Sequence, residues 1–279
     1  MIRRKHVGGG MAGVAEKSAA LREKPGVPKV RAVERATAIL NAFSAVENRL
    51  PLSELARRAN LDKSTTRRLL HTLSANEFIE FDEATQTYAL GPGILLLVPA
   101  VRFGSDLRDI SAPILARLSE QTGATSFLWT YFRGQALCLD RVKARDLHID
   151  TPWSAVGTSI SLNCAGGPRV LMAHLPPEQR ARVLKGPLPR YTEHTQTDRD
   201  VLESAAAEIR QRGWEFAVDD YVRGLSGLGV PICNRAGALA ASISITTLTP
   251  QFILDDDGKP VHLPVMLAAA AEIGARLQP

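Results

Sequence analysis

Cationic and polar side chains share one face of a short predicted helix near residue 65. They project to the same side at 100° per residue, and they are Lys63, Ser64, Arg67, His71 and Ser74. Lys and Arg can pair with phosphates or with guanine edges, and Ser and His can donate to the DNA backbone. A charged helical face is usually only solvated. The pattern therefore indicates DNA binding only if the neighbouring elements belong to a DNA-binding fold.

Two glycines precede a second predicted helix. Gly166 and Gly167 lead into a helix that is expected to begin at Pro168, where a missing N–H is tolerated. Unpaired amides at such a helix start, with no side chains in the way, are suited to holding a carboxylate. The alternative is a tight turn that needs glycine only for its dihedral angles. The residues alone leave both interpretations open.

Two further helices must position the cationic face. Apolar residues repeat at three and four positions between Val30 and Val46, which predicts one helix. A second is expected from near Pro51 to Asn60, with Ser53 able to cap its start. Asn60 suits the left-handed residue that closes a helix.

The helix with the cationic face is expected to run from Asp62, its N-cap, to about Asn76. A hairpin follows, with strands at residues 78–81 and 87–90. The side chains expected to face inward are Thr65, Leu69, Thr72 and Leu73 on the helix, and Phe78, Phe81 and Tyr88 in the hairpin. Together these elements predict a winged helix-turn-helix.

The rest of the chain mixes strands and helices without regular alternation. A helix after residue 93 is expected to be interrupted at Pro99, and an amphipathic helix covers residues 107–121. Arg133 and Gly134 suit a hairpin turn. Strands are expected at residues 126–132, 135–142, 147–149, 214–218, 228–234 and 238–246, and helices after Pro168, after Asp198 and at 263–277. This order favours an α+β fold with a mainly antiparallel sheet.

Charge separates a basic head from a mildly acidic body. The 279 residues carry a net charge of +5 and are 45% hydrophobic, enough for two cores. Residues 1–28 hold six basic and two acidic groups, residues 29–77 nine and five, and residues 78–279 nineteen and twenty-two. Positive charge at one end suggests a polyanion-binding head. Three scattered cysteines and the lack of a secretion or membrane-spanning segment favour a cytoplasmic protein with reduced thiols.

The segments at residues 33–40, 52–56 and 63–73 make the DNA-binding prediction more specific. Together they resemble the DNA-binding domain of IclR-type transcriptional regulators. The resemblance implies a dimer that places two recognition helices on a pseudo-palindromic operator in double-stranded DNA. Arg68 matches the family's arginine and is expected either to support a phosphate contact or to pack within the domain. The DNA-binding residues expected are Ser53, Lys63, Ser64, Thr66, Arg67, Arg68 and His71.

The C-terminal part resembles the GAF-like effector-binding domain of the same family. The resemblance implies that Gly166 and Gly167 line an effector pocket. Asn163 and Pro168 replace a usual histidine and glycine, so the effector is expected to be an unfamiliar one. Gly227 stands where many members have cysteine, so the resemblance implies no ligand contact by a thiol there. The residues expected around a small organic acid, aromatic or not, are Asn163, Cys164, Gly166, Gly167, Asp219, Ser244 and Thr246.

Two features of this predicted pocket have a structural alternative. Ser244 and Thr246 share one face of their strand because side chains alternate, but that face can equally be the solvent side of an antiparallel sheet. Trp129, Tyr131 and Trp153 can form an apolar wall, although large aromatic residues more often belong to a core.

The combined expectation is a ligand-responsive transcriptional regulator, a homodimer or homotetramer, without metal, cofactor or catalytic residues. Its predicted parts are a flexible arm (1–28), a winged helix-turn-helix (29–91), a linker helix (92–106) and an effector domain (107–279). In one alternative the C-terminal domain only forms oligomers. In another the chain is an enzyme, with Cys164 as nucleophile, His148 or His174 as base and Asp219 as orienting group. The lack of any catalytic motif argues against that enzyme.

Overall fold

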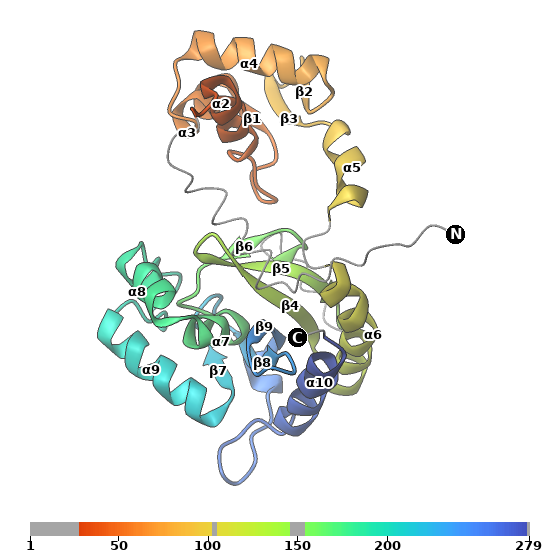
Figure 1. Ribbon diagram of the computed structural model, residues 1–279, viewed down its shortest axis with the longest axis vertical. Helices are drawn as coiled ribbons and strands as arrows, with labels where there is room; N and C mark the ends of the chain where they lie inside the picture. The colour runs from red at the N-terminus through yellow and green to blue at the C-terminus, as the bar shows by residue number, and fades with distance from the viewer. Residues whose placement is uncertain (1–27, 102–104, 146–153, 278–279) are drawn as a thin grey trace. The chain divides into compact units, whose positions relative to one another are not determined.

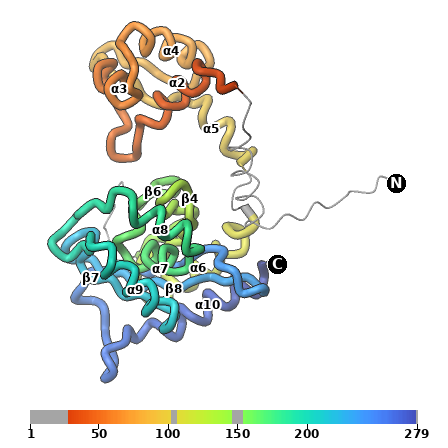
Figure 2. Tube along the Cα trace, turned by 60° about the vertical axis from the view of Figure 1, so that its left-hand side comes forward, coloured from red at the N-terminus to blue at the C-terminus, as the bar shows by residue number. Residues whose placement is uncertain are grey.

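A computed structural model describes residues 28–101, 105–145 and 154–277. The chain divides between Phe103 and Gly104 into two compact units (Figures 1 and 2). Most of the predicted arm, the predicted strand at 147–149 with His148, and Trp153 lie outside the described residues, as do residues 102–104 of the predicted linker helix.

Three helices build the N-terminal unit: α2 (Arg31–Leu40), α3 (Leu52–Arg58) and α4 (Lys63–Ala75). Their apolar side chains meet those of Leu50 and Ile79, from two short strands, in one buried cluster, whose helical members are Ile39, Leu55, Leu70 and Leu73. The three predicted helices are confirmed, although α2 ends at Leu40 and does not continue toward Val46.

The ends of α3 and α4 follow local rules with one exception. Asp62 caps α4, because its carboxylate accepts the backbone N–H of Thr65 at 2.8 Å. Asn60 adopts the predicted left-handed conformation, with φ of 53°. The expected cap at Ser53 is wrong: the N-cap of α3 is Pro51, no side chain caps the helix, and Ser53 lies exposed in its first turn.

The inward face of α4 lies one position from the predicted one. The buried residues are Thr66, Leu70 and Leu73, whereas Thr72 is exposed. Two sets of residues with the same helical spacing compete in the sequence pattern. One set is Thr65, Leu69 and Thr72, and the other is Thr66, Leu70 and Leu73. Packing against α2 and α3 selects the second set, so the burial expected for Thr72 is wrong.

The hairpin after α4 is present as predicted. It consists of β2 (Ile79–Asp82) and β3 (Thr87–Leu90), and a short strand, β1 (Leu50–Pro51), pairs with β3 on the other side. Phe81 stacks on Tyr88 with 4.7 Å between ring centroids, but Phe81 is 42% exposed. Its expected burial is therefore wrong, and sequence reasoning missed β1.

A short helix leaves the hairpin. α5 (Gly93–Leu97) is followed by a 3₁₀ turn, η1 (Val98–Ala100), which contains Pro99. The interruption predicted at Pro99 is thus present, because proline has no N–H with which to continue the helical ladder.

The C-terminal unit is built on a six-stranded antiparallel sheet in the order β6-β5-β4-β9-β8-β7. Its strands are β4 (Thr125–Phe132), β5 (Gln135–Val142), β6 (Ser159–Ile160), β7 (Glu215–Val218), β8 (Leu225–Cys233) and β9 (Leu239–Leu248). Arg133 and Gly134, both with positive φ, form the predicted turn between β4 and β5. The predicted antiparallel α+β fold is confirmed.

Helices cover both faces of this sheet. α6 (Ser105–Thr122) and α10 (Leu263–Arg276) pack together on one face, as Figures 1 and 2 show. α7 (Gly166–His174) packs on the other face, with α9 (Arg199–Arg212) against it and α8 (Pro177–Lys185) against α9. Sequence reasoning missed α8, and it placed the start of α7 at Pro168 when the helix begins at Gly166.

The hydroxyl face of β9 lies against α7 and not toward solvent. Ser242 Oγ donates to the carbonyl of Gly167 at 2.8 Å, and Trp129 Nε1 donates to Ser244 Oγ at 2.9 Å. The intervening Ile243 and Ile245 are fully buried. The solvent-side alternative for this face is therefore wrong.

Candidate DNA-binding surface and effector pocket

One face of α4 presents cationic side chains to solvent. Lys63, Arg67, Arg68 and His71 are exposed. Among the described residues, none of these four side chains forms a hydrogen bond or ion pair. Ser64 is exposed as well and donates to Asp62 at 2.7 Å. The exposure of Arg68 leaves its guanidinium available for a phosphate and argues against the packing role.

The arginines of the neighbouring helix α3 are, by contrast, occupied. Arg57 donates two hydrogen bonds to Glu54, at 2.6 and 2.9 Å. Arg58 donates to Glu54 and Glu47, both at 2.6 Å, and to the carbonyl of Ala42 at 3.1 Å. These arginine hydrogen bonds lower the pKa of Glu54 to about 2. The two arginines therefore tie α3 to itself and to the loop after α2.

Thr66 does not belong to the exposed face. Its side chain is completely buried, and its hydroxyl donates to the carbonyl of Asp62 at 2.8 Å. The expectation that Thr66 contacts DNA is therefore wrong. Ser53 is exposed at the start of α3, so its predicted contact stays a prediction.

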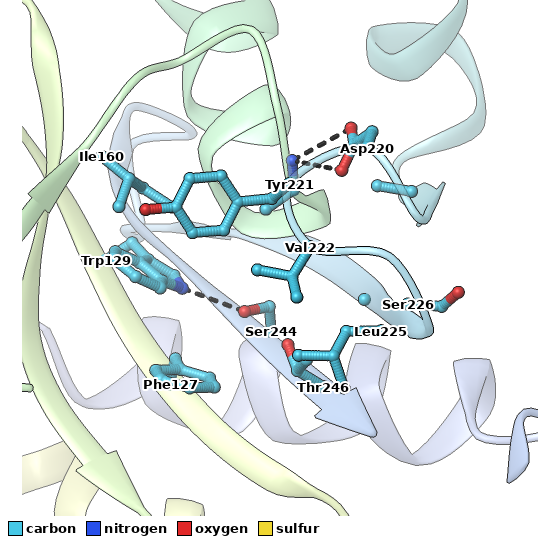
Figure 3. Close-up of a pocket in the computed structure, with 13 residues that line it drawn as sticks. Phe127, Trp129, Ile160, Asp220, Tyr221, Val222, Leu225, Ser226, Ser244 and Thr246 are labelled. Atoms are coloured by element: carbon cyan, nitrogen blue, oxygen red, sulfur yellow. Dashed lines mark hydrogen bonds between the residues drawn. The ribbon is translucent and has the colours of Figure 1, made fainter. Parts of the chain in front are cut away.

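A small cavity opens in the C-terminal unit on the α7 face of the sheet (Figure 3). Its wall is contributed by β4, by the β6–α7 connection, by the β7–β8 hairpin and by β9. The lining residues are Phe127, Trp129, Ile160, Ala165, Ala217, Asp220, Tyr221, Val222, Leu225, Ser226, Gly227, Ser244 and Thr246. About 30 Å³ is open to the centre of a water molecule, which is room for about two waters.

The cavity combines an apolar wall with a few polar groups. Phe127 and Trp129 stack with 5.3 Å between ring centroids, and Figure 3 shows the ring of Tyr221 near Ile160. Hydroxyls come from Ser244 and Thr246. Ser226 also belongs to the lining, but its hydroxyl shares a hydrogen bond of 2.9 Å with Thr249 and is directed away from Ser244 and Thr246 (Figure 3). Asp220 is the one acidic or basic side chain among the lining residues. Such a mixture suits a small molecule with an apolar body and a polar end.

Gly166 and Gly167 have a packing role. A Cβ at Gly166 would lie 2.5 Å from the carbonyl oxygen of Gly227, and a Cβ at Gly167 would lie 2.6 Å from Trp129 Cδ1. Neither glycine has a positive φ, so neither is required for its dihedral angles. Both are needed because the start of α7 lies directly on β8 and β4. They are not among the residues that line the cavity.

The other predicted effector residues divide into two groups. Ser244 and Thr246 line the cavity. The buried Asn163 holds a loop instead, because its amide donates to the carbonyls of Pro189 and Gln196 at 3.1 and 2.8 Å. Asp219, with φ of 55°, accepts the N–H of Gly224 at 3.2 Å within the β7–β8 turn.

Cys164 is a buried thiol that donates to the carbonyl of Ser161 at 3.4 Å. Burial raises its pKa well above the usual value. A thiol held neutral in this way is a poor nucleophile, so its chemistry is that of a small core residue.

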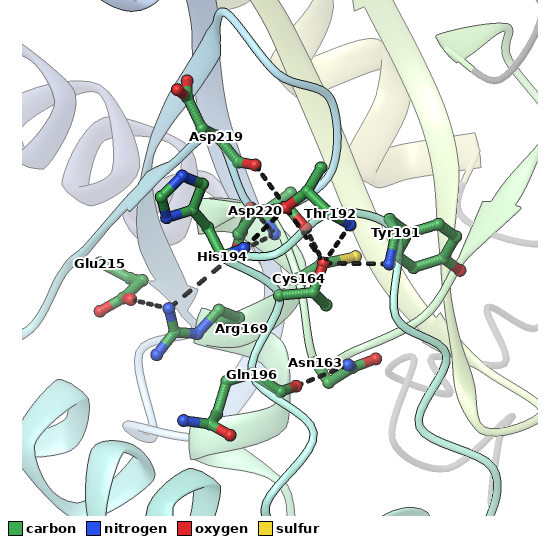
Figure 4. A network of polar contacts seen from close by, with 12 residues as sticks. Asn163, Cys164, Arg169, Tyr191, Thr192, His194, Gln196, Glu215, Asp219 and Asp220 are labelled. Carbon is green, nitrogen blue, oxygen red and sulfur yellow. Dashed lines mark hydrogen bonds and ion pairs between the residues drawn. The ribbon is translucent and has the colours of Figure 1, made fainter.

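Asp220 lies at the centre of a buried polar network (Figure 4). Both of its carboxylate oxygens accept the backbone N–H of Ala165, at 3.0 and 3.1 Å. Arg169 pairs with Glu215 at 2.6 Å and lies 3.9 Å from Asp220. Burial raises the pKa of Asp220, while the Ala165 amide and Arg169 act in the opposite direction.

Sequence reasoning predicted Trp129 as a wall residue but missed the other aromatic residues and the acidic residue of the lining. Strand alternation places Phe127 on the same face as Trp129. Asp220 was not predicted to contact an effector, whereas its neighbour Asp219 was. Tyr221 and Val222 lie in a turn with no periodic signal, so nothing local marks them as lining residues.

A winged helix-turn-helix and a separate α+β unit with an internal cavity define a DNA-binding transcriptional regulator with an effector-binding domain. The IclR helix-turn-helix domain model matches residues 32–83. The model of the bacterial transcriptional regulator IclR C-terminal domain matches residues 102–275. The chain belongs to the IclR family of bacterial transcriptional regulators, which is not a family of enzymes.

Individual relatives agree with this assignment. The HTH-type transcriptional regulator BhcR from Paracoccus denitrificans is 30% identical over 251 residues, which are 90% of this chain and 88% of the relative. An IclR family transcriptional regulator from Brucella abortus has the same fold, with a TM-score of 0.74, 22% identity and coverage of 96% and 97%. An IclR homologue from Microbacterium hydrocarbonoxydans, solved with 4-hydroxybenzoate, has a TM-score of 0.71, 23% identity and coverage of 88% and 98%.

The enzyme alternative, with Cys164 as nucleophile, is overturned by this family membership. Within the described residues, no helix is long and apolar enough to cross a membrane.

Proposed function

We propose that this regulator responds to a small aromatic carboxylate that binds in the cavity of the C-terminal domain. The single observation that carries the proposal is the lining itself: aromatic rings on one side, and the hydroxyls of Ser244 and Thr246 on the other. Rings provide apolar contact area, and hydroxyls can donate to a carboxylate. The 4-hydroxybenzoate complex of the Microbacterium hydrocarbonoxydans homologue supports the same class of ligand.

The cavity must widen to admit such a ligand. Its open space suffices for about two waters, less than a benzene ring needs. Tyr221 and Val222 are half-buried and lie in the β7–β8 turn, and we propose that this turn is the part of the wall that moves. Binding would then stabilise a widened conformation, which is the differential interaction that a ligand-driven switch requires.

DNA would be read by the exposed face of α4 in a homodimer or homotetramer. Leu95 and Leu96 on α5 are 70% and 76% exposed, and an exposed apolar pair of this kind supports self-association. Ligand binding would change the affinity for the operator by shifting the equilibrium between oligomer arrangements that differ in DNA affinity. Sedimentation of the full chain tests the oligomer, and a concentration-independent monomer would contradict it.

Calorimetry tests the effector site. Benzoate, 4-hydroxybenzoate and acetate are titrated into the wild-type chain and into Val222→Trp, whose larger side chain fills the cavity. The matched control is Val218→Trp, because Val218 is 43% exposed and does not line the cavity. We expect saturable heat from at least one aromatic acid with the wild type and the control, and none with Val222→Trp. Absence of saturable heat from every acid would favour a C-terminal domain that only forms oligomers.

A further inference from the structure

We propose that Asp220 occupies the anion position at the start of α7 as an internal ligand, and that an effector carboxylate displaces it toward Arg169. The proposal rests on the function proposed above and adds a mechanism by which the cavity distinguishes acids from neutral molecules. It concerns three groups around one corner of the cavity: the Ala165 amide, the Asp220 carboxylate and the Arg169 guanidinium.

The amide at the start of α7 already holds a carboxylate. The N–H of Ala165, the N-cap residue, donates to both oxygens of Asp220 at 3.0 and 3.1 Å. This carboxylate comes from 55 residues further along the chain. Helix N-termini stabilise negative charge through their free amides and dipole. Ala165 and Asp220 both line the cavity, so a bound acid would meet this occupied position.

A second partner for Asp220 is in place one turn along the helix. Arg169 Nη1 lies 2.6 Å from Glu215 and 3.9 Å from Asp220 Oδ2. Arg169 Nε is buried and has no hydrogen-bond partner within the described part of the chain. A buried donor without a partner is unfavourable, and a guanidinium can serve two carboxylates because its five N–H donors form a fork. Arg169 can therefore accept Asp220 as well as Glu215.

These observations together describe an exchange. Two carboxylates cannot share the Ala165 N–H without like-charge repulsion. When the effector's carboxylate takes that N–H, Asp220 moves toward Arg169 and closes the distance of 3.9 Å to its Nη1. The exchange leaves no carboxylate unpaired. A neutral ligand has no charge with which to drive the exchange.

The segment that carries Asp220 contacts residues 191–196, so a movement of Asp220 would be transmitted to them. The hydroxyl of Thr195 donates to the carbonyl of Asp220 at 2.5 Å, and that of Thr192 donates to the carbonyl of Asp219 at 2.7 Å. Tyr221, the next residue, meets Tyr191 edge to face with 4.6 Å between ring centroids. Displacement of Asp220 would therefore shift the segment at 191–196, which Figure 4 shows beside the network.

The direction in which Asp220→Ala changes the affinity for benzoate tests the proposal. Calorimetry with benzoate, and with benzamide as its neutral counterpart, compares the wild type, Asp220→Ala and Glu208→Ala. Asp220→Ala removes the internal competitor, so we expect benzoate to bind at least tenfold more tightly while benzamide changes less than threefold. Glu208 is exposed on α9, and its replacement controls for the loss of one negative charge. We expect that control to match the wild type within twofold.

Weaker or unchanged benzoate binding in Asp220→Ala would overturn the exchange, because it would make Asp220 a direct ligand contact or a bystander. If Asp220→Ala does not fold, Arg169→Lys replaces it. This variant keeps a charge for Glu215 but lacks the several fixed N–H donors with which a guanidinium serves two carboxylates, so we expect benzoate binding to weaken at least fivefold, and unchanged binding would overturn the exchange. Failure of the proposed function is distinguishable, since it gives no saturable benzoate heat with either the wild type or Asp220→Ala.

Discussion

The exposed face of α4 and the cavity of the C-terminal domain use their polar side chains in opposite ways. On α4, a single helix presents Lys63, Arg67, Arg68 and His71, and within the described residues these side chains have no protein partner. Around the cavity, Asp220 is hydrogen-bonded to Ala165, and Trp129 to Ser244. DNA offers partners to free side chains, whereas buried polar groups around a cavity are satisfied by hydrogen bonds within the protein.

This difference predicts that stability and DNA affinity respond to different substitutions. The largest expected effect is on stability, at the contact between α7 and β8. A Cβ at Gly229 would overlap the carbonyl of Gly166, so Gly229→Ala should destabilise the C-terminal domain by about 3 kcal/mol. The N-terminal domain should unfold as in the wild type, which denaturant titration followed by circular dichroism would measure.

Gly227→Ala is the matched control on the same strand. Its Cβ would lie 3.3 Å from Thr246 Oγ1 and 3.6 Å from the nitrogen of Gly166, which a small side-chain rotation accommodates. We expect a much smaller loss of stability than with Gly229→Ala. Equal losses would show that the close approach of Gly229 to α7 is not what matters.

The next effect is on DNA affinity, at α4. Arg67→Ala should weaken binding to a specific operator by about 1 to 3 kcal/mol if the side chain reads a base. Thermal unfolding should not change, because Arg67 has no partner among the described residues. Fluorescence anisotropy with operator and random DNA measures the effect, and a loss of the same size on both would reassign Arg67 to a phosphate.

Arg57→Ala provides the contrast on α3. Arg57 is already bound to Glu54 at 2.6 Å, so we expect its removal to leave operator affinity unchanged. A loss as large as that of Arg67→Ala would contradict the distinction between occupied and free arginines.

A smaller effect concerns the cap that positions α4. Asp62→Ala should lower the unfolding temperature of the N-terminal domain, because the Thr65 N–H loses its acceptor. Hydrogen bonds from Thr65 and Ser64 lower the pKa of Asp62 in the folded state. This stabilisation is therefore present above the unfolded pKa and is lost as the pH falls through the lower folded value. Asp62→Asn removes the charge of the cap but keeps its shape. In calorimetric scans the wild type should have a higher unfolding temperature than Asp62→Asn at neutral pH, and this difference should disappear in strong acid.

The smallest expected effect is a difference in reactivity between buried and half-buried cysteine thiols. Burial raises the pKa of Cys138 to about 12 and that of Cys164 well above its usual value, whereas Cys233 is only half-buried. A thiol reagent should modify Cys233 in the native protein, and the other two only on unfolding. Rapid modification of all three thiols would contradict the burial of the cavity domain's core.

The N-terminal domain could largely be predicted from its sequence, because its determinants are local. Asp62 and Asn60 act within their own turns, and α4 gathers its cations within nine residues, from Lys63 to His71. Thr66 was misplaced because two sets of the same spacing compete for the inward face, and only packing against the other helices chooses between them.

The cavity could not be predicted to the same extent, because it forms where distant segments meet. Ser244 and Thr246 could be assigned to one face from strand alternation. The lack of side chains at Gly166 and Gly167 serves close packing against β8 and β4, which the local sequence does not reveal, and their role in holding an effector stays a prediction. The partnership of Asp220 with Ala165 joins positions 55 residues apart, and no spacing rule signals it.

Operator affinity measured with and without a bound ligand tests the central claim most directly. DNA from upstream of the gene is titrated by anisotropy with the wild type and with Val222→Trp, using an acid that calorimetry has shown to bind. A typical coupling of 1 to 3 kcal/mol predicts that the saturating acid changes the wild-type operator Kd by roughly 5- to 150-fold. The filled-cavity variant should not respond. An acid that saturates the wild-type cavity and leaves the operator Kd unchanged would contradict a ligand-responsive regulator.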